Sequence, residues 1–433
     1  MLKIPFTKMT GNIILSTKRP ISIDLFSGAG GMGLGFEQAG FDVVAAVELD
    51  PIHCTTHEYN FPKCPMICNG VSELTGADIR KKANLGDQEI DVVFGGPPCQ
   101  GFSLIGKRSL EDPRNELLAD FVRLVSELNP KYFVMENVKG LTIGQQKNFL
   151  LEVIAAFEKR GYEVEKNYRV LNAKDFGVPQ DRQRLFLLGC RKGLKVPSYP
   201  KEETSFVTVG DAIGDIPNCD EFKELIESDQ VKIKRLTAKS EYAKKLKGYL
   251  QDSFDFSAPR NYDPSLLTSS MRTEHGKPSI NRFKKTTPGK VEPVSRFFKL
   301  DLDGVCNTLR AGTPSNKGAF TAPRPIHPAD GRCITVREAA RIHSYPDWFR
   351  FHSTKWHGFR QIGNSVPPLL ARAVASEIMK ALGVKPEKPK DVLNLGNLDF
   401  LSFTMTEAAK YYGVKPEVMG ARIRDEDKKN KNS

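Results

Sequence analysis

The stretch Ile21-Ser-Ile-Asp-Leu-Phe26, followed by Ser27-Gly28-Ala-Gly30-Gly-Met-Gly33, decides the fold. A short apolar segment that leads into closely spaced glycines is typical of a buried strand, a tight turn and the start of a helix. Glycines let the backbone approach a ligand closely, because no side chain intervenes. The pattern alone is a weak indication of a ligand site, since glycines that serve only a tight turn would look the same.

Strands and helices alternate through the first half of the chain. Further apolar strands are expected at 42–49, 90–94 and 131–135, and residues 116–128 have apolar side chains at helical spacing. Apolar strands separated by helices indicate a parallel sheet with both faces covered. We therefore predict an α/β fold with a doubly wound, Rossmann-like core, whose functional residues follow the carboxyl ends of the strands.

The regular pattern ends near residue 192. Residues 193–325 mix Pro, Gly, Ser and Lys in irregular runs, and regular structure resumes at 335–343 and 367–382. We expect the core over 18–192 and 306–383, an inserted domain over 193–305, and a linker with a small helical extension over 384–433. In the extension we expect Thr406 to be an N-cap and Gly413 a turn between two short helices, an arrangement that loosely resembles a helix-turn-helix but equally fits a plain helix pair.

Positive charge is concentrated in the insertion. The chain has 64 Lys and Arg against 52 Asp and Glu, a net charge of +12, and residues 230–300 alone hold 16 basic and 6 acidic residues. A local excess of this size favours a polyanionic partner, nucleic acid before membrane, because no basic amphipathic helix accompanies it. A solvated lysine-rich loop region remains the alternative on charge alone.

The remaining composition excludes other classes of protein. With 433 residues, of which 39% are hydrophobic and 27% charged, the chain can bury a full core. It has no apolar run long enough to cross a bilayer, and eight cysteines in so long a chain do not make a disulfide scaffold. We expect a soluble, reduced, cytoplasmic protein. One group of His and Cys matches no recognised zinc spacing, and we expect no metal there: His53, Cys54, His57, Cys64 and Cys68.

Several strand ends carry residues suited to chemistry. Gly95-Gly-Pro-Pro-Cys99-Gln-Gly-Phe-Ser103 places a cysteine on a rigid, glycine-flanked loop, where a thiolate can be exposed and stabilised. Glu136 follows the next strand and is expected to face the same cleft. Arg182 and Arg184 alternate, so an extended chain would point both into one site. Glu48 ends a strand about 20 residues beyond the glycine turn, where an acid can bind a ribose hydroxyl pair, which predicts a nucleoside-bearing cofactor.

Six segments resemble the motifs of the DNA cytosine-5 methyltransferases, in the order and approximate spacing of that family. They are Asp24-Leu-Phe-Ser-Gly-Ala-Gly-Gly31, Gly96-Pro-Pro-Cys99-Gln100, Glu136-Asn-Val138, Gln180-x-Arg182-x-Arg184, Arg337-Glu-Ala-Ala-Arg341 and Gly363-Asn-Ser365. The resemblance covers about residues 20–190 and 305–382. It implies S-adenosyl-L-methionine as cofactor, double-stranded DNA as partner, and a target recognition domain in the basic insertion.

The resemblance also implies roles for single residues. Cys99 would be the nucleophile that adds to C6 of a flipped cytosine, and Glu136 would hold and protonate N3. Arg184, helped by Arg182, would hold the base O2. The S-adenosylmethionine pocket would be lined by Phe26, Gly28, Gly30, Glu48, Pro98 and Asn364, with Glu48 on the ribose. The acid that the family usually directs at the cofactor adenine is absent here, because Asn69 or Gly70 stands in its place and Asp78 lies further along.

We expect the insertion to choose the target. Its base-reading side chains are expected to be Arg260, Asn261, Arg272, Asn281, Arg282 and Arg296. Its phosphate contacts are expected to be Lys234, Lys244, Lys245, Lys284 and Lys285. The family implied is the bacterial restriction-modification type, which suggests a monomer that acts at the nucleoid, with a restriction endonuclease as a possible genetic companion.

Three alternatives stay open from the sequence. An RNA cytosine-5 methyltransferase would use the same chemistry, but an irregular insertion of about 115 residues fits major-groove reading better. A nicotinamide-dependent oxidoreductase would explain the glycine turn and Glu48 but leaves Cys99, Glu136 and the arginine pair unexplained. A non-catalytic DNA-binding module is disfavoured because the catalytic set is complete.

Overall fold

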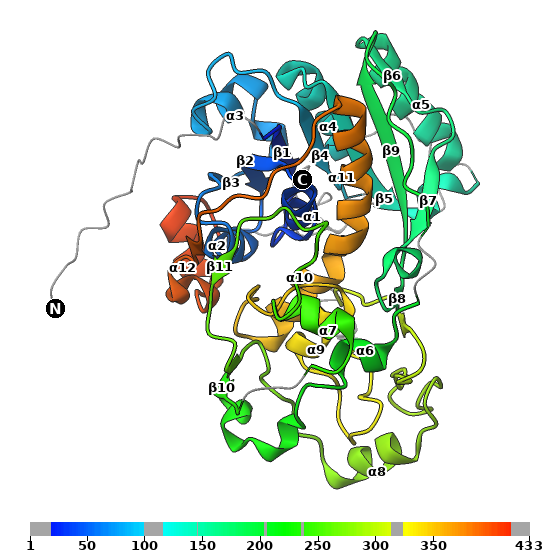
Figure 1. The fold of residues 1–433 in the computed structure, drawn as a ribbon, viewed down its shortest axis with the longest axis vertical. Coiled ribbons are helices and arrows are strands. Elements are labelled where there is room, and N and C mark those ends of the chain that lie inside the picture. The colour runs from blue at the N-terminus through cyan, green and yellow to red at the C-terminus, as the bar shows by residue number, and fades with distance from the viewer. Residues whose placement is uncertain are drawn as a thin grey trace, which may run out of the picture.

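The computed structural model describes residues 19–98, 116–144, 146–202, 206–234, 238–312 and 324–416. Its centre is an eight-stranded sheet in the order β3-β2-β1-β4-β5-β9-β6, with β7 also paired to β9 (Figure 1). The strands are β1 (Ile21–Leu25), β2 (Asp42–Glu48), β3 (Met66–Cys68), β4 (Val92–Gly95), β5 (Tyr132–Val138), β6 (Tyr162–Val164), β7 (Arg169–Asn172) and β9 (Gln183–Arg191).

The strand order predicts a ligand-binding crevice at the carboxyl ends of β1 and β4. The strands from β3 to β5 pair in parallel, whereas β9 runs antiparallel to β5. Chain order reverses between β1 and β4, and ligands of doubly wound sheets bind at such a reversal. The predicted α/β, Rossmann-like core is therefore confirmed, and its site is expected where the glycine turn after β1 meets the proline loop after β4.

Helices cover both faces of the sheet. On one face lie α1 (Gly31–Ala39) and α11 (Pro368–Leu382); on the other lie α3 (Gly76–Lys82), α4 (Glu116–Leu128) and α5 (Gln146–Lys159). Successive side chains of a strand point to opposite faces of the sheet. The two helical layers are therefore contacted by different strand residues, as one aromatic pair on each face shows. Phe94 stacks on Phe36 of α1 at 3.7 Å between ring centroids, and Phe133 stacks on Phe157 of α5 at 3.9 Å. The helix expected at 116–128 is confirmed as α4.

The insertion consists of short elements. They are α6 (Val209–Ile213), β10 (Val231–Lys232), α7 (Glu241–Leu246), β11 (Arg260–Asn261), β12 (Leu266–Leu267) and α8 (Lys277–Lys285). Most of them lie in the lower part of Figure 1, while β11 lies higher, near α2 (Pro51–Asn60) and α12 (Met405–Tyr412). α6 shares an apolar core with α9 (Val336–Ile342) and α10 (Lys355–Asn364), in which Ile213, Ile342 and Phe349 are fully or almost fully buried. β10 and β12 belong to a separate small cluster around Leu267, and α8 to another around Phe283. The chain rejoins the core region at β13 (Cys306–Asn307), parallel to β8 (Gln180–Asp181).

Two buried arginines of α9 hold the insertion in place. Arg337 donates to the carbonyl and hydroxyl oxygens of Thr268 and to the carbonyl of Phe349. Arg341 pairs with Asp347 through two nitrogens and with Asp215 at 3.2 Å. Charge-assisted bonds of this kind are strong and directional, so these side chains fix the insertion relative to α9.

The chain after α11 packs back onto the molecule. β14 (Leu393–Asn394) pairs with β11, and α12 (Met405–Tyr412) lies beside α2 (Pro51–Asn60) (Figure 1). The N-cap prediction is wrong: Thr404, not Thr406, caps α12, in a capping box with Glu407. The turn at Gly413 is confirmed by its φ of +69°, while the second expected helical stretch lies mostly outside the described residues.

Short 3-10 helices complete the described structure. They are η1 (Val71–Glu73), η3 (Lys139–Thr142), η4 (Ala173–Phe176), η5 (Cys219–Glu221), η6 (Lys223–Ile226) and η8 (Leu398–Leu401). In the part of the chain that the structure describes, no helix has the length and apolar character needed to cross a bilayer.

Candidate active site

The glycine turn after β1 is tied to the end of β2 by one carboxylate. Glu48 Oε2 accepts the N–H of Gly28 at 2.9 Å, and its Oε1 accepts the N–H of Asp50 at 2.8 Å. Gly28 has a φ of +56°, and a Cβ added there would meet no atom of the described residues within 4 Å, so among these residues the space beside it is open. Gly30, with a φ of +100°, packs against the ring of Phe61 instead. Phe26, also at positive φ, begins the turn. These predicted cofactor residues are therefore brought together.

A second carboxyl lies beneath the turn. Asp24 is almost fully buried, and a Cβ added at Gly33 would lie 2.9 Å from its Oδ2. Burial, with the nearby charge of Glu48, raises the pKa of Asp24 well above its ordinary value, against the lowering effect of the Gly33 N–H. Asp24 thus favours its neutral form, and the carboxyl group that contacts the N–H of Gly28 in this turn is that of Glu48.

Asn69 lies next to Glu48, at the position where the family usually has an acid directed at the cofactor adenine and this sequence has none. It follows β3 directly, and its N–H donates to the carbonyl of Glu48 at 3.0 Å. Asp78 is instead engaged in the capping box of α3 with Thr75. The exposed side chain of Leu49 stands beside this edge, 43% exposed. The side-chain oxygen of Asn69 accepts the N–H of Gly70 at 2.8 Å, so an amide, rather than a carboxylate, follows β3.

The loop after β4 lies against Glu136 of β5. A Cβ added at Gly96 would be 2.7 Å from Glu136 Oε2, and Asn137 Nδ2 donates to the carbonyl of Pro97 at 3.0 Å. This loop carries Pro98 and leads to Cys99, which lies outside the described residues. The structure therefore brings Glu136 to the base of the loop that bears the expected nucleophile.

Glu136 and Arg184 form an ion pair at the edge of the sheet. Arg184 Nε lies 2.9 Å from Glu136 Oε1, and both side chains are mostly buried. Burial raises the pKa of Glu136 above its ordinary value, although the guanidinium groups of Arg184 and Arg182 act in the opposite direction. A carboxyl with a raised pKa holds a proton more readily, which suits a group that must donate one.

Arg182 does not point to the same partner as Arg184. Its side chain is fully buried, and it donates to the carbonyl oxygens of Leu309 (2.8 Å), Gly363 (2.8 Å) and Ser365 (2.7 Å). Arg182 was expected to help Arg184 hold the base O2, and in the structure its hydrogen bonds go to these backbone carbonyls. Its guanidinium instead holds the backbone on both sides of Asn364.

Asn364 ends α10 and is exposed at the junction with α11. A Cβ added at Gly31 would lie 2.8 Å from the Cβ of Ser365, so this junction touches the glycine turn. His343 is a residue that sequence reasoning missed: its ring joins Gln180 at 2.8 Å to the carbonyl of Ser365 at 3.2 Å. No sequence signal marked it, because its partners come from distant segments.

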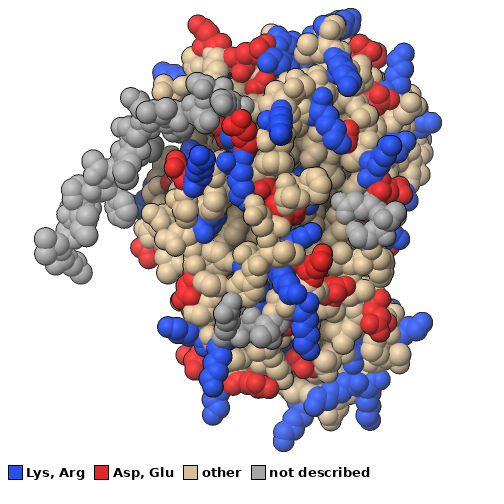
Figure 2. Space-filling view, viewed as in Figure 1, with Lys and Arg blue, Asp and Glu red and all other residues tan. Residues whose placement is uncertain are grey.

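The insertion residues differ from expectation in one clear case. Arg260 is buried, pairs with Glu37 of α1 through two nitrogens and lies 4.7 Å from the ring of Trp348, so its assignment as a base-reading residue is wrong. Arg282 contacts Glu292. Asn281 and Arg296 are exposed, as are Lys234, Lys245, Lys284 and Lys285, whereas Lys244 is half-buried. Lys and Arg side chains project along the lower end of the face in Figure 2, the end that carries α8.

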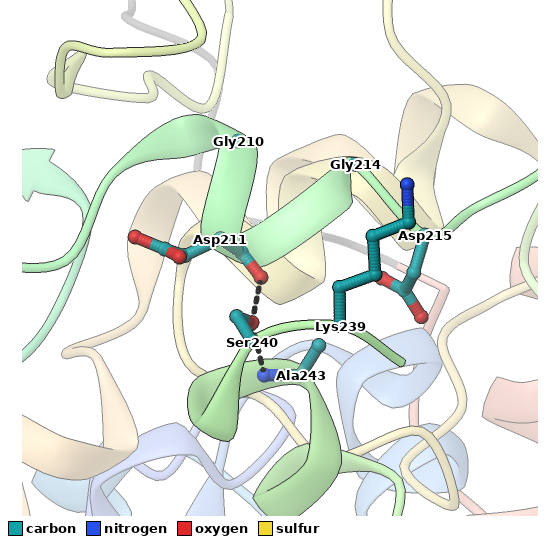
Figure 3. Close-up of a pocket in the computed structure, with 7 residues that line it drawn as sticks. All are labelled: Gly210, Asp211, Gly214, Asp215, Lys239, Ser240 and Ala243. Carbon is teal, nitrogen blue, oxygen red and sulfur yellow. Dashed lines mark hydrogen bonds between the residues drawn. The ribbon is translucent and has the colours of Figure 1, made fainter. Parts of the chain in front are cut away.

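One pocket of about 320 Å³ lies between α6 and α7 (Figure 3). It is lined by Gly210, Asp211, Gly214, Asp215, Lys239, Ser240 and Ala243. Ser240 Oγ donates to the carbonyl of Asp211, and Asp215 is engaged by Lys247 and Arg341. None of the predicted catalytic or cofactor residues that the structure describes lines this pocket.

Comparisons with known proteins agree with this site. The model of the C-5 cytosine-specific DNA methylases matches residues 21–380. The chain is 61% identical over 410 residues to the type II methyltransferase M.XorII of Xanthomonas oryzae pv. oryzae, covering 95% of this chain and 96% of the relative. It is 35% identical to the type II methyltransferase M1.HphI of Haemophilus parahaemolyticus, over 83% of this chain and 86% of the relative.

A solved structure shares the architecture. A crystal structure from E. coli, described as a DNA modification methyltransferase encoded within a prophage, matches with a TM-score of 0.70 and 34% identity, over 84% of this chain and 99% of that chain. These matches confirm the resemblance drawn from the six motifs, and with it the dependence on S-adenosylmethionine; they exclude the nicotinamide oxidoreductase. The chain belongs to the family of C-5 cytosine-specific DNA methylases.

Proposed function

We propose that Cys99 and the Glu136–Arg184 pair form the catalytic centre of a sequence-specific enzyme that methylates C5 of a cytosine flipped out of duplex DNA. The observation that carries the proposal is the placement of a mostly buried carboxyl, paired with Arg184 at 2.9 Å, against the loop that leads to Cys99. A cytosine needs a proton donor at N3 and a cation near O2, and this pair supplies both.

The chemistry follows from the reactivity of the base. C5 of cytosine is a poor nucleophile, because the ring is electron-poor. The Cys99 thiolate forms a bond to C6, Glu136 gives its proton to N3, and the electrons of the former C5–C6 double bond become available at C5. When bound, S-adenosylmethionine supplies an electrophilic methyl group. Water takes the C5 proton, the C5–C6 double bond re-forms as the thiolate is expelled, and N3 returns its proton to Glu136. These steps restore the neutral ring and free Cys99.

The described residues fit the cofactor. Glu48 presents its carboxylate beside the space at Gly28, where it is proposed to bind the ribose. Asn69, which contacts the Glu48 backbone, is proposed to lie near the adenine. The pocket is proposed to include Phe26, Gly28, Gly30, Pro98 and Asn364. Arg182 is proposed to be a positioning residue, because its bonds to Gly363 and Ser365 fix the backbone around Asn364.

A base stacked in a duplex cannot reach Cys99, so the cytosine must be extruded, at a cost of a few kcal/mol. Phosphate contacts from the basic insertion offset part of that cost. The function is tested by expressing the gene in a host that lacks cytosine-5 methylation and sequencing its DNA and RNA after bisulfite treatment. We expect protected cytosines at one short DNA sequence. Protection in RNA alone would instead support the RNA-directed alternative.

The type II names of the relatives support the proposal that this is the modification enzyme of a restriction-modification system. We further propose that it acts as a monomer at the nucleoid and that a restriction endonuclease is its genetic companion. The insertion over 193–305 is proposed to be the target recognition domain. Its exposed lysines, such as Lys284 and Lys285 on α8, lie at the end of the molecule where basic side chains project (Figure 2).

Exchange of the insertion is expected to change the target. We predict that grafting 193–305 from a relative of different specificity gives a chimera that methylates the relative's site, because side chains that read base edges lie in the insertion and the chemistry does not. Bisulfite sequencing of host DNA measures the outcome. An active chimera that still methylates the original site would place recognition elsewhere.

A further inference from the structure

The chain after α11 forms a strap, residues 384–416, which lies beyond the 21–380 match to the family model. The sequence suggested a linker here, but the segment is packed. Pro386 sits so close to Gly40 that a Cβ added there would lie 2.5 Å from it, and Leu393 N–H donates to the carbonyl of Pro259 at 2.8 Å. The strap therefore joins the core to the insertion before it reaches α2.

The strap backbone then lies directly on α2. Gly396 N–H donates to the carbonyl of Tyr59 at 2.8 Å, and a Cβ at Gly396 would be 2.9 Å from the Tyr59 Cα. The buried side chains of Phe400 and Leu401 pack against Tyr59, with Phe403 partly buried beside them. This close packing fixes the carboxyl end of α2.

Two neighbouring hydroxyls of α12 share one carboxylate of α2. Tyr411 donates to Glu58 Oε1 at 2.8 Å, and Tyr412 donates to Glu58 Oε2 at 2.7 Å. Burial, together with the charge of Glu58, raises the pKa of both tyrosines, so both stay protonated donors. Hydrogen bonds to a charged group are about twice as strong as those between neutral groups.

From Glu58, α2 leads back to the cofactor side of the crevice. Asp50 caps the first turn of α2 by accepting the N–H of Ile52 at 3.0 Å, and the N–H of Asp50 donates to Glu48 at 2.8 Å. Cys54, one turn further along α2, contacts the carbonyl of Glu48 at 3.4 Å. A shift of α2 would therefore move the Glu48 carboxylate.

The strap also braces α10, which ends at Asn364. His352 Nε2 lies 3.0 Å from the carbonyl of Phe403, and Ser353 N–H donates to the carbonyl of Leu401 at 2.7 Å, just before α10 begins. Arg360 of α10 in turn pairs with Asp50 at 2.7 Å. Helix α2, which follows Glu48, and helix α10, which ends at Asn364, are thus linked both to the strap and to each other.

We propose that this strap is a positioning element of the S-adenosylmethionine pocket and that the contact of Tyr411 and Tyr412 with Glu58 is its anchor. The strap holds α2 and α10 so that Glu48 and Asn364 face the cofactor. This inference rests on the proposed roles of those two residues. The Glu136–Arg184 pair lies on β5 and β9, whereas the anchor contacts α2. Loss of the anchor is therefore expected to weaken cofactor binding and to leave the rate of the chemical step unchanged.

The test is the double variant Tyr411→Phe/Tyr412→Phe, which keeps both rings and removes both hydroxyls. We expect the KM for S-adenosylmethionine, and its Kd by calorimetry, to rise about tenfold, in line with the loss of hydrogen bonds to a charged group. We expect kcat at saturating cofactor and the Kd for DNA to stay within about twofold of the parent. Lys410→Gln, an exposed change on the same helix, is the matched control and leaves all four values unchanged.

A Glu48→Gln variant is measured in parallel. If Glu48→Gln weakens cofactor binding and the double variant does not, the strap inference alone is overturned. A double variant that loses kcat with an unchanged KM shows a merely structural strap and also overturns it. If Glu48→Gln leaves the Kd for the cofactor unchanged, the pocket assignment in the proposed function fails, and the route from strap to cofactor fails with it.

Discussion

Replacing Cys99 with alanine should abolish methyl transfer while S-adenosylmethionine still binds. The thiolate is the group that makes C5 of cytosine reactive, and no other described cysteine is available for the role, since every free cysteine among the described residues is buried. We expect turnover to fall by at least about a thousandfold, because removal of a covalent nucleophile leaves only binding effects. Single-turnover transfer of labelled methyl groups to DNA measures the rate, and calorimetry measures cofactor binding.

The matched control for this variant is Cys190→Ala, which removes a thiol from β9 of the same sheet. It should retain cofactor binding and most of the activity. Substantial turnover in Cys99→Ala would exclude the covalent route, and loss of cofactor binding would show that the loop has a structural role instead.

Replacing Glu136 with glutamine should lower the single-turnover rate by about 10²- to 10⁴-fold, the range for removal of a general acid. The amide keeps the shape and a hydrogen-bonding group beside Arg184, so DNA and cofactor should bind nearly as before. Glu163→Gln, the same change at an exposed position of β6, should have no effect. A near-parental rate in Glu136→Gln would show that this carboxyl is not the N3 partner.

The pH dependence sharpens the Glu136 prediction. Burial raises the pKa of Glu136, so the protonated fraction persists above the ordinary range of a glutamate and declines as the pH rises through the raised pKa. The ratio of the parental rate to the Glu136→Gln rate should therefore fall with rising pH. The ionisation of Cys99 affects both proteins alike and cancels in the ratio.

Local patterns predicted the core well. The helix at 116–128 has apolar residues at helical spacing and a proline just beyond it, and both signals lie within one short window. The strands of the crevice were expected for the same reason, and their carboxyl ends placed Glu48 and Glu136 at one edge of the sheet. The sequence also held the correct N-cap signal, because Glu407 stands three residues after Thr404, whereas Ala409 follows Thr406 at that spacing.

Contacts between distant segments could not be predicted in this way. Arg182 meets Gly363 and Ser365 only because α10 and β9 are folded together, and alternation along the strand gave no sign of those partners. Arg260 was predicted to read bases because it is positively charged. A basic residue can nevertheless be buried when it forms an ion pair with a carboxylate from another part of the chain, as Arg260 does with Glu37. The packing of the strap could not be predicted either, because its Pro- and Lys-rich composition is typical of linkers.

The most direct measurement of the central claim uses duplex DNA with 5-fluorocytosine at the methylated position, found by bisulfite sequencing. Fluorine cannot leave C5 as a proton does, so the thiolate cannot be expelled after methyl transfer. We predict a protein–DNA adduct that survives denaturing electrophoresis, forms only when S-adenosylmethionine is present, maps to the peptide that contains Cys99, and is absent in Cys99→Ala. No adduct from a preparation that methylates ordinary DNA, or an adduct on another residue, would contradict the account.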